Sequence, residues 1–123
     1  MATDSLFAAI RNGDVNDVER RIGEGADAHA TSTTDYSTTS MHMTLDIAYY
    51  DTARAMIHVL VGAGVSIDAE YNEQTALDFA LGDGLAKWNT ASIQALVDMG
   101  ADLRGWEAED LLKKGVGLLG LIS

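Results

Sequence analysis

The fold is decided by the stretch Ile93-Gln94-Ala95-Leu96-Val97-Asp98-Met99-Gly100-Ala101-Asp102, which joins an apolar helical run to a glycine turn. Related stretches run from Val18 to Asp27 and from Ile57 to Ser66. Their turn glycines are spaced 39 and 36 residues apart and are Gly25, Gly64 and Gly100. Because glycine is the commonest residue just past the end of a helix, each stretch predicts a helix that stops at its glycine.

A second apolar segment precedes each stretch, from Leu6 to Gly13, Thr44 to Ala48 and Thr75 to Ala80. Each unit therefore predicts a helix, a tight turn, a second helix, a glycine C-cap and an extended excursion. Helices this short are not stable in isolation, so we expect each to bury its apolar stripe against neighbouring units. The expected core residues are Phe7, Leu45, Ile57, Leu60, Leu77, Phe79, Ile93 and Leu96.

The segment Thr75-Ala76-Leu77-Asp78-Phe79-Ala80 resembles the T-P-L-H-x-A signature of ankyrin repeats, with Ala for Pro and Asp for His. Over about residues 5–103 the chain is similar to a short ankyrin-repeat stack. The resemblance implies a mainly α fold, an ankyrin-repeat α-solenoid of antiparallel helix pairs joined by β-hairpin-like loops. It implies one domain, 1–123, with units at about 4–30, 43–69 and 75–103 and a half-repeat cap at 104–123.

Two insertions distinguish this chain from a plain stack, because the ankyrin period is about 33 residues. We place the first at Thr31 to His42, where five threonines and three serines favour extended or loop structure. In an ankyrin frame this segment forms an elongated hairpin finger. We place the second insertion at Gly82 to Trp88, between the two helices of the third unit.

The composition is strongly acidic, with 19 acids, 8 bases and a net charge of −11. Between Ile22 and Ala86 there are ten acids and one base, Arg54. Such a field repels nucleic acid and anionic membranes and speeds encounter with basic partners, although it could also serve solubility alone. The chain has no cysteine, no visible signal peptide and no apolar run of membrane-spanning length, so we expect a cytoplasmic protein.

The sequence offers weak candidates for chemistry. Residues 115–120 match G-x-G-x-x-G, but only three residues follow, and a dinucleotide-binding unit needs a strand before the motif and a helix after it. We expect the histidines, His29, His42 and His58, to have surface or capping roles rather than to bind metal. No nucleophile lies in a recognisable catalytic context. We therefore expect a protein that is not an enzyme, without a cofactor, a metal or catalytic residues.

The ankyrin resemblance implies capture of a partner through the hairpin tips and the concave face of the inner helices. Acidic residues map to these places, and aromatic residues, which are common at binding hot spots, lie in the two insertions, in the second hairpin and at the end of the second unit's first helix. We predict that this acidic face binds a protein with a basic surface, without direct binding of nucleic acid or membrane. The predicted partner-binding residues are Asp35, Tyr36, Tyr50, Asp51, Asp68, Glu70, Tyr71, Glu73, Asp83 and Trp88.

Two alternatives stay open at this point. The chain could be an inhibitor whose carboxylates mimic nucleic acid and block a nucleic-acid-binding protein. It could instead be a structural homo-oligomer that associates through the apolar tail, Val116 to Ile122, although we expect a monomer rather than a dimer.

Overall fold

The fold is mainly α. A computed structural model describes residues 2–29, 39–83, 90–107, 109 and 111, and in these ranges it contains helices and no strand. The elements are α1 (Ala2–Asn12), α2 (Val15–Gly23), α3 (Ser40–Met43), the 3-10 helix η1 (Thr44–Asp46), α4 (Tyr50–Gly62), α5 (Ala76–Asp83) and α6 (Thr90–Asp98). None of these helices is long and apolar enough to cross a membrane.

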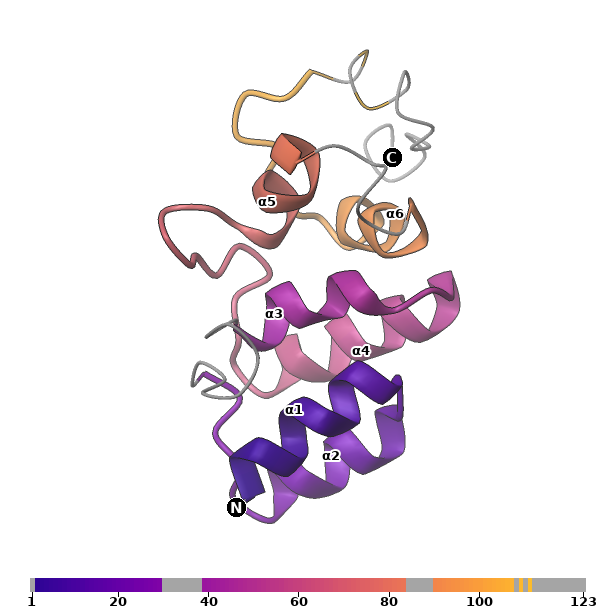
Figure 1. Ribbon diagram of the computed structural model, residues 1–123, viewed down its shortest axis with the longest axis vertical. Helices are drawn as coiled ribbons and strands as arrows, with labels where there is room; N and C mark the ends of the chain where they lie inside the picture. The colour runs from indigo at the N-terminus through magenta and orange to yellow at the C-terminus, as the bar shows by residue number, and fades with distance from the viewer. Residues whose placement is uncertain (1, 30–38, 84–89, 108, 110, 112–123) are drawn as a thin grey trace.

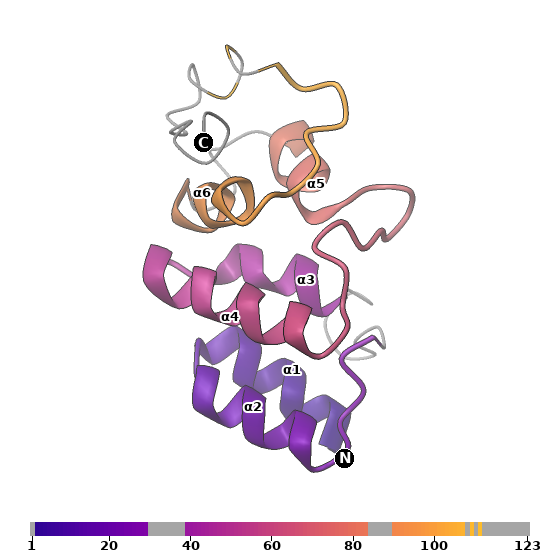
Figure 2. The same ribbon diagram turned by 180° about the vertical axis from the view of Figure 1, so that it is seen from behind.

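The helices are arranged as three successive pairs along the long axis of the molecule (Figure 1). The pairs are α1 with α2, α3 with α4, and α5 with α6. Helices α1 to α4 run across the view, whereas α6 is seen nearly end-on from both sides (Figures 1 and 2). The third pair is therefore turned relative to the first two, and the stack is not evenly repeated.

The three predicted glycine turns have the same hydrogen bonds. Gly25, Gly64 and Gly100 all have positive φ, at 103°, 97° and 96°. The N–H of each glycine donates to the carbonyl three residues back, and the next N–H donates to the carbonyl five residues back, at 2.9–3.1 Å. This is the Schellman pattern, which satisfies carbonyls left free at a helix end. The prediction that α2, α4 and α6 end at these glycines is confirmed.

The core is one continuous cluster that runs through all three pairs. Seven of the eight expected core residues are fully buried: Phe7, Leu45, Ile57, Leu60, Leu77, Ile93 and Leu96. The exception is Phe79, which is only partly buried. Ala76, Leu77 and Ala80 of α5 face the core, whereas Asp78 and Phe79 between them are only partly buried, because successive helical positions cannot all face one core.

The predicted hairpin finger is wrong at its C-terminal end. Residues 31–38 lie outside the described residues, but Thr39 to His42 begin the second unit. Thr39 is the N-cap of α3, and its side chain accepts a hydrogen bond from the His42 N–H at 3.1 Å. Thr39 and Gly64 are 25 residues apart, as are Thr75 and Gly100. The second unit thus begins at residue 39 rather than 43.

The start of α2 and the C-terminal segment show further local features. Asp14 caps α2, since its carboxylate accepts the Asp17 N–H at 3.1 Å. In the predicted C-terminal cap, Leu111 is fully buried and its N–H donates to the Glu107 carbonyl at 3.3 Å. The apolar tail and residues 84–88 of the predicted insertion lie outside the described residues, whereas Gly82 and Asp83 belong to α5.

Candidate interaction surface

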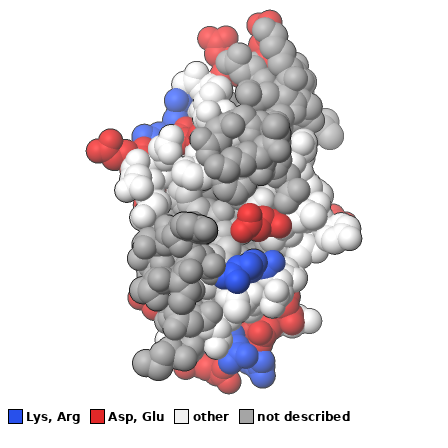
Figure 3. All heavy atoms as spheres, in the orientation of Figure 1, with Lys and Arg blue, Asp and Glu red and all other residues white. Residues whose placement is uncertain are grey.

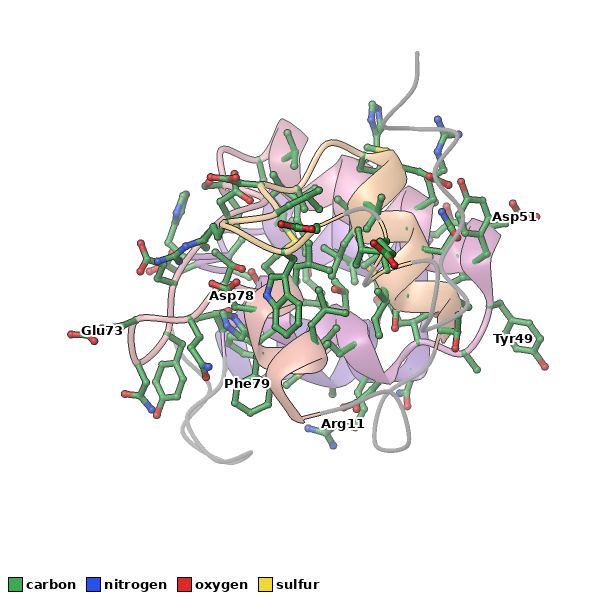
Figure 4. All side chains as sticks on the ribbon, turned by 90° about the horizontal axis from the view of Figure 1, so that it is seen from above. Arg11, Tyr49, Asp51, Glu73, Asp78 and Phe79 are labelled. Carbon is green, nitrogen blue, oxygen red and sulfur yellow. The ribbon has the colours of Figure 1, made fainter. Side chains whose placement is uncertain are left out.

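Two surfaces border the helix pairs at opposite ends of their helices. We call the segments 24–29, 63–75 and 99–106, which follow α2, α4 and α6, the loop edge. We call the connections at 13–14 and 47–49 the helix-turn side. Viewed from above, Glu73 of the loop edge projects away from one side of the molecule, and Tyr49 of the helix-turn side projects from the other (Figure 4).

A second repeated feature follows each glycine turn on the loop edge. Two residues after the glycine stand Asp27, Ser66 and Asp102, and each side chain accepts the N–H of the residue two positions on, at 2.9–3.1 Å. Such Asx and Ser turns stabilise the backbone without strand pairing. The loops therefore leave the glycine turns along the same local path in all three units.

Side chains also join the second loop to the third. The Asp68 carboxylate accepts the N–H of Asp102 at 2.8 Å. The Arg104 guanidinium reaches Glu70 at 3.4 Å and Asp78 at 3.2 Å. The Arg104 guanidinium thus contacts two of the four carboxylates at this junction, those of Glu70 and Asp78, so a negative excess remains there. On the face seen in Figure 3, basic atoms likewise lie next to acidic ones.

The tip of the second loop is a tight turn. The N–H of Tyr71 donates to the Gln74 carbonyl at 2.9 Å, and the N–H of Gln74 donates to the Tyr71 carbonyl at 3.2 Å. The two central residues, Asn72 and Glu73, have φ of 53° and 66°. Positive φ at both positions defines a type I′ turn, whose usual sequence is Asn-Gly. Glu73 therefore occupies a position that glycine would fill with less strain.

The structure divides the predicted partner-binding residues into two groups. Asp68, Glu70, Tyr71 and Glu73 lie together on the loop edge. Tyr50 and Asp51 begin α4 on the helix-turn side, so their predicted placement with the hairpin tips and inner helices is wrong. Asp83 ends α5, and its side chain lies outside the described residues, as do Asp35, Tyr36 and Trp88.

Tyr50 has a structural contact. Its hydroxyl donates to the Asp98 carboxylate at 2.7 Å, and this bond raises the pKa of the phenol. Its neighbour Tyr49 is 76% exposed and is the N-cap of α4, where it makes no side-chain capping bond. Tyr49 is thus the more accessible of the two rings.

A groove of about 490 Å³ lies between α2, α4 and the end of α6. Apolar side chains line part of it, including Val15, Val59 and Met99. Its charged lining has both signs, with Glu19 and Asp51 beside Arg54. This mixed lining does not favour one charge of ligand.

His42 was predicted to be a surface or capping residue, but it is 6% exposed, so the expectation of a surface role is wrong. Its Nε2 lies 2.9 Å from the Gln74 carbonyl, and its Nδ1 is hydrogen-bonded to the Thr39 hydroxyl. Burial lowers the pKa of the ring, and the Gln74 carbonyl opposes this by raising it. The spacing Thr39-x-x-His42 is that of T-P-L-H, so the ankyrin signature could have located this residue.

Arg104 is the other residue that sequence reasoning missed. It pairs with Glu70 of the preceding loop and with Asp78 of α5, and no local sequence motif predicts these ion pairs. Among the described residues, no three His, Asp or Glu side chains gather closely enough to hold a metal ion. Comparisons of this chain with protein-family models, with curated proteins and with solved structures find no match.

Proposed function

We propose that this chain is a non-catalytic protein-binding module, a short solenoid of ankyrin type, that binds a basic protein surface through its loop edge. The repeated Schellman turns and Asx or Ser turns support three equivalent units. Such loops in a repeat stack present successive side chains to one partner. The proposed contact residues are Glu70, Tyr71 and Glu73, with Asp68 holding the loop in place.

One observation carries this proposal: a glutamate stands at a positive-φ position, and its carboxylate projects away from the helices. A non-glycine residue in this conformation costs about 1–2 kcal/mol. Local rules of this kind are most often broken at functional sites. A solvent-facing carboxylate held there against the backbone preference is consistent with selection for binding rather than for stability.

The test is to capture a partner with the full chain and then measure its affinity for matched charge-reversed variants. Glu73→Lys removes a loop-edge charge that makes no ion pair within the described residues. We expect it to weaken binding several-fold, mainly through slower association, and we expect wild-type affinity to fall with added salt. Asp68 and Glu70 are poorer choices for charge reversal, because their carboxylates hold Asp102 and Arg104.

Asp51→Lys is the matched control, since it makes the same charge change on the helix-turn side. It should leave the affinity within about twofold if the loop edge is the site. Loss of binding in Asp51→Lys with none in Glu73→Lys would move the site to the other surface. A salt-independent affinity would contradict the basic partner.

A further inference from the structure

His42 lies where the second and third helix pairs meet. It stands on α3, and its ring is packed edge-on against Tyr71 of the tight turn, at a centroid distance of 6.3 Å, and against Phe79 of α5, at 6.1 Å. The ring thus connects one helix to both the partner-binding turn and the helix that follows it. Any change in the ring's position acts on these three elements together.

The hydrogen bonds of the ring fit its neutral form. The Thr39 oxygen accepts the backbone N–H of His42, which leaves its hydroxyl hydrogen to donate to Nδ1. Nε2 then carries the ring proton and donates it to the Gln74 carbonyl. Both ring nitrogens are used in the Nε2–H tautomer, which we infer from the partners.

A protonated ring would be a buried cation without a carboxylate. No ion pair joins the ring to any acid among the described residues. The described charged groups on the elements packed around it are Glu70 and Glu73 beside or in the turn, Asp78 on α5, Asp46 in η1, Arg11 on α1, Asp51 and Arg54 on α4, and Glu24 and Asp27 in the first loop. Asp78 is already engaged by Arg104. Burying an unpaired charge is costly, so a charged ring is more stable in water than between Tyr71 and Phe79.

We propose that His42 gates the partner-binding turn by protonation: the neutral ring holds the Tyr71–Gln74 turn against α3, and the charged ring leaves its site and frees the turn. The release of the turn stands on the packing of His42 alone. Its consequence, a loss of partner binding in mildly acidic solution, rests on the proposed function of the loop edge.

The sign of the pH dependence follows from burial. The pKa of His42 is lowered from 6.5 in the folded protein, so the released ring takes up a proton more readily than the packed one. The closed turn is therefore fully stable above about pH 6.5 and loses stability as the pH falls toward the ring's own pKa. Within that window each pH unit weakens closure by up to about tenfold.

NMR between pH 7.5 and 5 tests the gate without any partner. The ring resonances of His42 give its pKa, which is compared with the ordinary histidine value of 6.5. Amide-exchange protection factors of Tyr71 and Gln74 report closure of the turn, and that of Val65, in the neighbouring glycine turn, is the control. We expect Tyr71 and Gln74 to lose protection as the pH falls while Val65 keeps it.

Variants distinguish opening of the turn by protonation of His42 from a loss of stability of the whole protein at low pH. His42→Gln can keep a donor to Gln74 but cannot be charged, so its turn should keep the same protection at pH 5 as at pH 7.5. His58→Gln should behave as the wild type. If His42→Gln does not fold, the wild-type ring titration still decides: a His42 pKa at the ordinary value of 6.5, or unchanged turn protection, would overturn the proposal. A turn that opens while partner affinity stays constant would contradict the loop-edge binding site and leave the gate standing.

Discussion

The loop edge and the helix-turn side of this molecule differ in how strictly they repeat. On the loop edge, every unit has the same Schellman bonds and the same Asx or Ser turn two residues later. On the helix-turn side, Asp14 caps α2, whereas Tyr49 stands before α4 without a cap. Successive loops touch each other, as Asp68 touches Asp102, so their geometry must match. The described connections of the helix-turn side, 13–14 and 47–49, are not joined to each other by a hydrogen bond, so their geometry is freer to vary.

The largest expected effect comes from breaking a repeated turn. Gly64→Ala places a Cβ at φ 97°, outside the region that side-chain-bearing residues prefer, and this Cβ would lie 3.5 Å from the His29 ring. We expect a loss of about 1–2 kcal/mol in the free energy of unfolding, measured by urea denaturation. Gly25→Ala has the same strained φ with no atom within 4 Å of the Cβ, so it measures the strain alone.

The control for both substitutions is Gly62→Ala. Gly62 is within α4, has no positive φ, and a Cβ there meets nothing within 4 Å. Because alanine favours a helix over glycine, this variant should gain up to about 1 kcal/mol. Equal losses of stability in Gly62→Ala and Gly64→Ala would show that the positive φ of Gly64 is not the reason that glycine is needed in this turn.

A smaller effect is expected from removing one helix cap, or adding another, on the helix-turn side. Asp14→Ala removes the acceptor of the Asp17 N–H and should cost about 1 kcal/mol. Tyr49→Asp supplies the missing cap of α4 and should gain a similar or smaller amount, because that N–H end has no side-chain acceptor now. Thermal unfolding of both variants checks these signs. A loss in Tyr49→Asp would mean that the exposed ring contributes packing that the cap does not replace.

The sequence predicts the loop edge better than it predicts the helix starts. Gly25, Gly64 and Gly100 announce the turns because few other residues tolerate that φ. The start of the second unit was misplaced, since the threonines and serines of residues 31–42 suggested a loop. Thr39 acts there as a helix cap, a role for which threonine is equally suited. Composition alone does not separate these two roles.

The candidate site was only partly predictable. The sequence shows which residues are charged, but it does not show which of them form ion pairs or hydrogen bonds within the molecule. Asp68 and Glu70 were expected to face a partner, yet both are occupied within the molecule, by Asp102 and Arg104. Those contacts join residues 34 positions apart, and the repeat spacing places such residues on neighbouring loops without showing which side chains pair. The separation of Tyr50 and Asp51 from the loop edge likewise depends on where α4 begins. Glu73 was expected in a hairpin segment, and it stands at an exposed turn without an ion pair to any described residue.

The smallest effect is a gain at that turn. Glu73→Gly places glycine in the position that a type I′ turn prefers, so we expect roughly 0.5–1 kcal/mol of added stability, measured by urea denaturation. Asn72→Gly should gain less, because asparagine tolerates positive φ better than glutamate does. If the loop edge binds the partner, Glu73→Gly will also weaken binding, and this opposition of stability and affinity is typical of functional positions. A variant that is less stable than the wild type would show that Glu73 supports the fold, and its strained conformation would then no longer argue for a binding site.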